Sequence, residues 1–299
     1  MPTKLRLGRR FTGSDNRPHM TVLEVLQSTT GYFKKRNIDS PRLNAEHLLS
    51  HVLGRKRIEL YMEFERRLGE SELKPLRELV KRRGSGEPLQ HLLGTVEFCG
   101  RTFRCDKRAL VPRPETEQLV ELLISHFKSE IAFSRMVDVG TGSGVIALSL
   151  AAEFPKAEVV GVDISEDALV LARENAERLD LADRVRFLRS NLLESVPPGF
   201  DLIVANLPYI SIEDRQSLSR EVLHDPEAAL FAGPRGDELL QQLIAQAPFQ
   251  LGPGGRLALE IGIGQSDMLV AALAEKNYRD IWTENDYSGV TRFLFARYG

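Results

Sequence analysis

The chain has 299 residues, of which 42% are hydrophobic and 27% are charged, which allows one large globular domain beside a smaller one. No apolar run approaches the roughly 20 residues of a membrane span, and the N-terminus lacks the apolar core of a secretory signal. We therefore expect a cytoplasmic protein whose two cysteines, Cys99 and Cys105, are reduced. No Cys/His cluster has the spacing of a zinc site, so no metal is predicted.

The formal net charge of −2 hides an uneven distribution. Residues 1–95 contain 19 Lys and Arg against 11 Asp and Glu, a net charge of +8. Residues 96–299 contain 21 Lys and Arg against 31 Asp and Glu, a net charge of −10. The basic part could steer an acidic protein or RNA toward the chain. Solvated faces of charged helices explain the same distribution equally well.

The first part of the chain is predicted to be a basic extension followed by helices. Residues 1–19 carry five basic side chains with little apolar content and no periodicity, which predicts disorder. Over residues 20–94, apolar residues recur at helical spacing, in four stripes that begin at Val22, Ala45, Ile58 and Leu73. This pattern predicts a small helical bundle.

The period changes after residue 94. Apolar residues around Gly100 predict a β-hairpin linker over 95–114, before a helix at Gln118–Phe127. From there to residue 299, strands and helices alternate, which is typical of a doubly wound α/β sheet covered on both faces. The last two strands should form an antiparallel hairpin. The predicted strands are 135–140, 157–163, 184–189, 201–206, 255–261, 279–284 and 291–297.

A glycine-rich loop follows the first of these strands. Glycines at 140, 142 and 144 allow a tight turn and a close approach of a ligand to the backbone. A dinucleotide fingerprint would have its third glycine at the place of Val145, so a nicotinamide or flavin cofactor is disfavoured. Asp138, two residues before the first glycine, suits instead the charged amino-acid end of S-adenosylmethionine.

Residues after the next strands complete the predicted cofactor site. Asp163 ends the second strand, where a carboxylate can accept two hydrogen bonds from ribose hydroxyls. Ile164 could pack on the adenine, and Asn191 could meet its edge. The predicted cofactor-binding residues are Asp138, Gly140, Thr141, Gly142, Gly144, Asp163, Ile164, Asn191 and Asn206.

The segment Asn206-Leu207-Pro208-Tyr209 follows the fourth strand and predicts a clamp for a planar amide or amine. An amide nitrogen is a poor nucleophile, so the site must hold its NH₂ group by both hydrogens. The Asn206 side-chain oxygen can accept one hydrogen and the Leu207 backbone carbonyl the other. Pro208 holds Leu207 extended, and Tyr209 can stack on the planar group. These four residues are the predicted catalytic residues, because the two acceptors stabilise the charge that grows on nitrogen.

Over residues 20–299 the chain resembles the HemK/PrmC family, the N5-glutamine methyltransferases of peptide chain release factors. The glycine loop and the clamp carry part of this resemblance, with Leu207 where the family usually has proline. More family-specific are the segments Gly86-Glu87-Pro88-Leu89-Gln90-His91-Leu92-Leu93-Gly94, Glu97-Phe98-Cys99-Gly100, Val111-Pro112-Arg113-Pro114-Glu115-Thr116-Glu117 and Gly289-Val290-Thr291-Arg292. Asp225-Pro226-Glu227-Ala228-Ala229-Leu230 is similar to a further family segment and is interpreted as an ordering loop near the site.

The resemblance implies a Rossmann-like class I methyltransferase domain over 115–299, behind a helical domain that helps to engage a release factor. The methyl donor would be S-adenosyl-L-methionine, and the acceptor would be the glutamine of the release factor's Gly-Gly-Gln loop. Phe98 and Arg113 would line the acceptor side together with the clamp.

Two other methyltransferase activities stay open. An adenine-N6 DNA methyltransferase uses a similar clamp, but it needs base flipping and a target-recognition region, and none is evident here. Because the catalytic part is also acidic, direct binding of nucleic acid is not expected. A ribosomal-protein glutamine methyltransferase shares the chemistry and would differ only in its N-terminal domain. A binding module without activity should have lost the clamp or the cofactor carboxylates.

Overall fold

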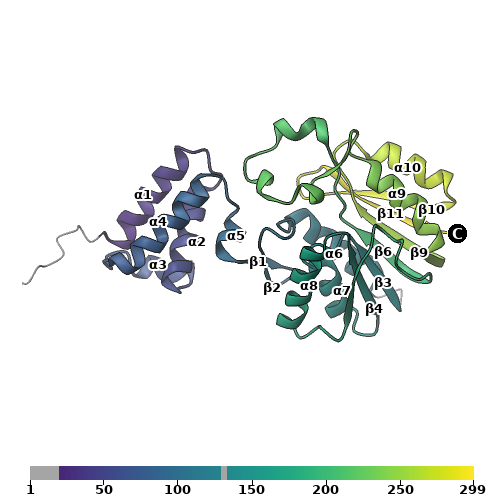
Figure 1. Cartoon of the computed structure of the whole chain (residues 1–299), viewed down its shortest axis with the longest axis horizontal. Helices are drawn as coiled ribbons and strands as arrows, with labels where there is room; N and C mark the ends of the chain where they lie inside the picture. Colours follow the sequence, from purple (N-terminus) through teal and green to yellow (C-terminus); the bar gives the residue numbers. More distant parts are fainter. Residues whose placement is uncertain (1–19, 129–132) are drawn as a thin grey trace, which may run out of the picture. The chain divides into compact units, whose positions relative to one another are not determined.

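The computed structural model describes residues 20–128 and 133–299, in two compact units that meet between Gly84 and Ser85. The predicted disordered extension, residues 1–19, lies outside the described residues. Within them, no helix is long and apolar enough to cross a membrane. Figure 1 shows the two units, which we describe separately.

The first unit, from Met20 to Gly84, is a bundle of helices, as predicted. A capping box starts its first helix: the Thr21 N–H donates to the Glu24 carboxylate at 2.8 Å, and the Glu24 N–H donates to Thr21 Oγ1 at 3.2 Å. Residues of the predicted stripes, such as Leu48 and Leu76, are buried between the helices. The helices are α1 (Val22–Lys34), α2 (Pro41–Leu53), α3 (Arg57–Met62) and α4 (Glu70–Gly84).

The second unit begins with a short helix and a two-stranded hairpin, α5 (Leu89–Leu93), β1 (Thr95–Phe98) and β2 (Arg101–Arg104). By compactness α5 groups with the hairpin, and the Cys105 N–H donates to the Gly94 carbonyl at 3.1 Å. Cys99 and Gly100 have φ of 46° and 69°, the positive values of a two-residue hairpin turn. Both cysteines are free.

A seven-stranded sheet forms the centre of the second unit, in the order β10-β11-β9-β6-β3-β4-β5 (Figure 1). The strands from β9 to β5 are parallel, and β10 and β11 form the predicted antiparallel hairpin at one edge. The strands are β3 (Arg135–Val139), β4 (Glu158–Asp163), β5 (Val185–Arg189), β6 (Phe200–Ala205), β9 (Leu251–Glu260), β10 (Tyr278–Asn285) and β11 (Thr291–Tyr298).

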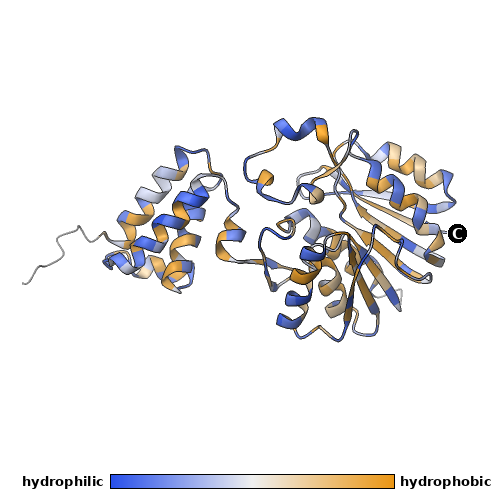
Figure 2. Ribbon diagram, viewed as in Figure 1, coloured by the Kyte–Doolittle hydropathy of each residue, from blue (hydrophilic) through white to orange (hydrophobic). Residues whose placement is uncertain are grey.

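Helices cover both faces of this sheet. One apolar cluster joins α6, α7 and α8 to Met136, and the other joins α9 and α10 to Val137, the next residue of β3. Successive side chains of a strand point to opposite faces, so β3 must be apolar on both, and Figure 2 shows the strands of the sheet as mostly hydrophobic. The helices are α6 (Pro114–Phe127), α7 (Val145–Glu153), α8 (Glu166–Arg178), α9 (Glu238–Gln246) and α10 (Ser266–Glu275). The predicted doubly wound α/β fold is confirmed.

Two parts of this unit differ from the sequence-based prediction. Helix α6 begins at Pro114, four residues earlier than expected, because proline suits the first helical position and the acidic residues that follow favour the first turn. The secondary structure between β6 and α9 was not predicted. It contains two short paired strands and three 3₁₀ turns: β7 (Ile210–Ser211), β8 (Phe231–Gly233), η1 (Ile212–Ser217), η2 (Val222–His224) and η3 (Glu227–Ala229).

Candidate active site

The order of the strands reverses between β3 and β6. From β3 the chain runs outward through β4 and β5, and it then returns to β6 on the other side of β3. The carboxyl ends of β3 and β6 therefore flank the crevice where doubly wound sheets bind ligands. Gly140 follows β3 and Asn206 follows β6, so the fold brings the glycine loop and the clamp together.

Two cavities share the clamp as a common wall. The larger has a volume of about 350 Å³ and the smaller about 150 Å³, and Asn206, Leu207 and Pro208 line both. Cavities of this kind hold small ligands or parts of them. The predicted cofactor residues in the wall of the larger cavity are Gly140, Gly142, Asp163, Ile164, Asn191 and Asn206. The smaller cavity is also lined by Arg113, Tyr209 and Glu260.

Asp138 lies fully buried under the glycine loop. Its Oδ2 accepts hydrogen bonds from Thr141 Oγ1 at 2.6 Å and from the Ala147 N–H at 3.1 Å, so Asp138 and Thr141 shape the loop from below. Its other oxygen, Oδ1, has no hydrogen-bond partner within the described residues. Burial raises the pKa of Asp138 to about 7. A cationic group beside Oδ1 would favour the ionised form.

Asp163 stands at the carboxyl end of β4 in the wall of the larger cavity. Its Oδ2 accepts from the Gly142 N–H at 2.9 Å and its Oδ1 from the Ser165 N–H at 2.8 Å, which fixes the direction of the carboxylate. Burial raises its pKa. The neighbouring Ile164 is 55% exposed although it is apolar, and Asn191 donates to Glu194 Oε1 at 2.8 Å.

These residues fit a nucleoside that carries a cationic amino-acid tail. Asp163 has lone pairs left for two hydroxyls, and Ile164 offers an apolar surface to a base. A Cβ built on Gly142 would meet no atom nearer than 3.8 Å, so the loop lies open to the cavity. The buried Oδ1 of Asp138 lacks a donor within the described residues, and Asp138 lies beneath the loop, outside the cavity wall.

The clamp residue Asn206 is held by a hydrogen-bond chain. Its Nδ2 donates to Thr116 Oγ1 at 2.8 Å, and Thr116 Oγ1 donates to Glu260 Oε2 at 2.7 Å. Within the described residues, Asn206 Oδ1 and the Leu207 carbonyl accept no hydrogen bond. Two acceptor oxygens from adjacent residues are thus available where the two cavities meet.

Leu207 and Tyr209 have different surroundings on either side of Pro208. Leu207 is 4% exposed, and its Cδ2 lies 2.8 Å from a Cβ built on Gly140, so the side chain packs directly on the glycine loop. Tyr209 lies in the smaller cavity, with its hydroxyl 3.4 Å from Glu260 Oε1 and its ring centroid 5.9 Å from the Arg292 guanidinium carbon. The backbone carbonyl of Leu207 does not depend on this side-chain packing, and any residue at this position would present it.

The structure separates the two other predicted substrate residues. Arg113 lines the smaller cavity and donates to Asp225 Oδ2 at 2.5 Å, and burial raises the pKa of Asp225 to about 6. Asp225 also accepts from the Val111 N–H at 3.1 Å, so it links the segment before α6 to the loop after η2. Phe98 is only 2% exposed and packs edge-to-face on Phe103 in the core, away from both cavity walls. We therefore leave Phe98 out of the acceptor site.

Comparisons with known proteins cover most of the chain. A model of the PrmC N-terminal domain matches residues 24–94, and one of the methyltransferase small domain matches residues 115–235. A protein named release factor glutamine methyltransferase from Rhodopirellula baltica is 41% identical, over 92% of this chain and 95% of that protein. A protein of the same name from Geobacter sulfurreducens is 40% identical, over 93% of this chain and 97% of that protein.

The chain belongs to the release factor glutamine methyltransferase family. Solved methyltransferase structures share its fold. The catalytic domain of hMettl16, in complex with a MAT2A 3′UTR hairpin, matches with a TM-score of 0.53 at 16% identity, over 76% of this chain and 82% of that one. A methyltransferase from Pyrococcus furiosus matches with a TM-score of 0.51 at 19% identity, over 66% of this chain and 88% of that one. At these identities the likeness shows the fold alone, a Rossmann-like methyltransferase fold.

Other residues of the site in this family member escaped the sequence analysis. Thr116 lies within a quoted motif but before Gln118, where the helix was expected to begin, and Glu260 ends a strand without any motif. Ala109 and Leu110, in the loop after the hairpin, line the larger cavity. The position of Glu260 at the carboxyl end of β9, next to β6, is a signal that could have found it. No group of His, Cys, Asp and Glu in the described ranges is arranged to hold a metal ion.

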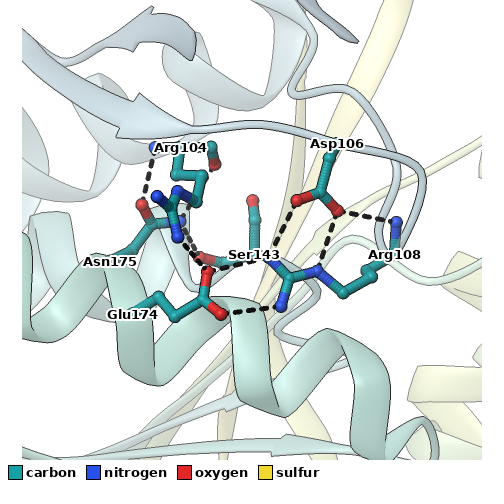
Figure 3. Close-up of polar contacts among 6 residues, drawn as sticks. All are labelled: Arg104, Asp106, Arg108, Ser143, Glu174 and Asn175. Atoms are coloured by element: carbon teal, nitrogen blue, oxygen red, sulfur yellow. Dashed lines mark hydrogen bonds and ion pairs between the residues drawn. The ribbon is translucent and has the colours of Figure 1, made fainter. Parts of the chain in front are cut away.

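A polar network ties the hairpin to the glycine loop (Figure 3). Asn175 of α8 is fully buried: its Oδ1 accepts from the Arg104 N–H at 2.6 Å, and its Nδ2 donates to the carbonyls of Arg104 at 3.1 Å and Ser143 at 2.9 Å. Beside it, Glu174 accepts from Arg104 and Arg108, each at 2.8 Å. The network fixes the carbonyl of Ser143, one residue before the loop's third glycine.

We expect Asn175→Asp to lower the free energy of unfolding by about 2–4 kcal/mol, because a buried carboxylate cannot donate to the two carbonyls and repels them. The matched control is Asn285→Asp at an exposed position, where the carboxylate can still accept from Thr291 Oγ1, and it should change the free energy by no more than about 0.5 kcal/mol. Urea unfolding followed by circular dichroism compares the two. Equal effects of both substitutions would contradict a structural role for Asn175.

Proposed function

We propose that this chain transfers a methyl group from S-adenosyl-L-methionine to the side-chain nitrogen N5 of the glutamine in the Gly-Gly-Gln loop of peptide chain release factors. The observation that carries the proposal is the pair of free acceptor oxygens, Asn206 Oδ1 and the Leu207 carbonyl, in the wall shared by the two cavities. Membership of the release factor glutamine methyltransferase family supports the acceptor.

The larger cavity holds the cofactor. Asp163 would accept hydrogen bonds from the ribose hydroxyls, Ile164 would pack on the adenine and Asn191 would meet its edge, since all three line this cavity. The carboxylate of Asp138 balances the positive charge of the amino-acid end, either directly or through the loop that it holds. When bound, S-adenosylmethionine supplies an electrophilic methyl group on its sulfonium.

The clamp acts on the acceptor amide. Asn206 Oδ1 and the Leu207 carbonyl each accept one hydrogen of the NH₂ group, which fixes the plane of the amide and aims its nitrogen at the larger cavity. As positive charge grows on that nitrogen, the same two oxygens stabilise it. The ring of Tyr209 stacks on the amide plane, and no side chain needs to remove a proton before the transfer. Alignment by the clamp contributes at most about 7–11 kcal/mol to the lowering of the barrier.

The partner of the reaction is a protein. The helical domain, residues 20–94, helps to engage the release factor, and the hairpin linker over 95–114 joins it to the methyltransferase domain. The net charge of +8 in residues 1–95 favours an acidic partner surface there. Because release factors act in translation, we place the enzyme in the cytoplasm. Direct binding of nucleic acid is not part of the proposal.

The test is methyl transfer from labelled S-adenosylmethionine to a purified bacterial release factor. Beside it run a variant whose loop reads Gly-Gly-Ala, a mixture of ribosomal proteins and a DNA duplex. We expect label on the wild-type factor alone. Label on DNA or on a ribosomal protein, with none on the release factor, would overturn the proposed acceptor and leave the fold and the cofactor standing. Label on both forms of the factor would move the reaction away from the loop glutamine.

A further inference from the structure

A buried carboxylate stands behind the clamp and has no part in the reaction described above. Glu260, the last residue of β9, is 1% exposed. Its Oε2 accepts from Thr116 Oγ1 at 2.7 Å, and its Oε1 lies 3.4 Å from the hydroxyl of Tyr209. Burial disfavours the charged form of a carboxylate. A buried carboxylate therefore lowers the stability of the fold unless hydrogen bonds to it offset the cost.

The hydrogen bonds that join Asn206, Thr116 and Glu260 have one consistent direction. A threonine hydroxyl has a single hydrogen, and an ionised carboxylate can only accept, so Thr116 must donate to Glu260. Only lone pairs of Thr116 Oγ1 are then left for Asn206, and the atom of Asn206 at 2.8 Å must be the donor, Nδ2. The charge on Glu260 thereby turns Asn206 Oδ1 away from Thr116.

We propose that Thr116 and Glu260 are positioning residues for methyl transfer: the Glu260 carboxylate orders the Thr116 hydroxyl, which sets the Asn206 side-chain amide with its oxygen toward the acceptor. The inference rests on the proposed function of the clamp. If the Asn206 amide were flipped, two N–H donors would face the NH₂ group of the acceptor, and the clamp would repel the group that it has to hold. The oxygen and nitrogen of an asparagine amide have nearly the same shape, so packing alone cannot select between them.

This series of hydrogen bonds should lose its direction when Glu260 is protonated. The pKa of Glu260 is raised to about 7: burial and the charge of Glu115 raise it, and the hydrogen bond from Thr116, the charge of Arg292 and the Tyr209 hydroxyl oppose them. A protonated carboxyl can donate to Thr116, whose own hydrogen is then free to point at Asn206. The ordering therefore becomes complete as the pH rises well above about 7, and it is lost as the pH falls through that value.

The experiment compares three variants of the full chain at saturating S-adenosylmethionine. Thr116→Val keeps the shape and removes the hydroxyl, and Thr116→Ser is the matched control that keeps it. We expect kcat to fall about tenfold or more in Thr116→Val and less than threefold in Thr116→Ser, with cofactor affinity within twofold of wild type in both. In Glu260→Gln, kcat should fall, and its rise between pH 6 and pH 8 in the wild type should disappear.

A second readout needs no acceptor, so it separates this inference from the proposed function. The side-chain NH₂ signal of Asn206 is identified in a ¹H–¹⁵N spectrum by its loss in Asn206→Ala. In the wild type this signal should shift with pH around an apparent pKa near 7, and Thr116→Val and Glu260→Gln should abolish the shift. A signal that does not respond to pH, or equal losses of kcat in Thr116→Val and Thr116→Ser, would overturn the positioning role. An inactive wild type with a responsive signal would overturn only the proposed acceptor.

Discussion

Replacing Asn206 with alanine is expected to lower kcat for methyl transfer by about 10²–10³-fold while the affinity for S-adenosylmethionine stays within about threefold of wild type. The substitution removes one of the two oxygens that we propose to hold the acceptor amide, and the loss of one such charge-stabilising group typically costs about 2.7–4 kcal/mol in the transition state. The cofactor cavity keeps its other walls, including Asp163 and Gly142. Single-turnover kinetics and calorimetry measure the two quantities.

The variant should also fold normally, because Thr116 can still donate to Glu260 after Asn206 loses its side chain. An unfolding midpoint close to that of the wild type is the control for this. A loss of cofactor affinity as large as the loss of kcat would contradict the clamp, since Asn206 would then belong mainly to the cofactor site. Unchanged kcat would contradict it as well.

Replacing Asp163 with alanine is expected to weaken S-adenosylmethionine binding by about a hundredfold or more. A hydrogen bond to a charged group contributes about 1.5–3 kcal/mol, and the carboxylate can accept two from the ribose. The substitution also removes the acceptor of the Gly142 N–H at 2.9 Å, so the glycine loop loses one of its supports. Isothermal calorimetry measures the affinity directly.

Two further variants sharpen this test. Asp163→Asn keeps one acceptor oxygen and should give an intermediate affinity, whereas Asp167→Ala removes an exposed carboxylate from the next helix and should leave the affinity unchanged. Because both alanine variants alter the net charge equally, a long-range charge effect would appear in both. Equal affinities of Asp163→Ala and the wild type would rule out the ribose role.

Local patterns were sufficient to predict much of the fold. The apolar runs of β3, β4 and β6 and the helical stripes of the first unit predicted elements that the structure contains, because period and burial are coupled within single elements. The segment from 210 to 233 has no such period. Its short strands and 3₁₀ turns are held by contacts such as that between Arg113 and Asp225, which are 112 residues apart. No local pattern reports a contact of that kind.

The sequence by itself determined the doubly wound fold and the family, and it located the glycine loop and the segment from Asn206 to Tyr209, because each depends on residue types at short spacing. Only the tertiary structure decided that Phe98 belongs to the core, and that Thr116 and Glu260 stand behind Asn206. The direction of a side-chain amide depends on which donors and acceptors surround it in space. Here those groups come from α6, β9 and the end of β6, which the chain brings together from positions as far as 144 residues apart.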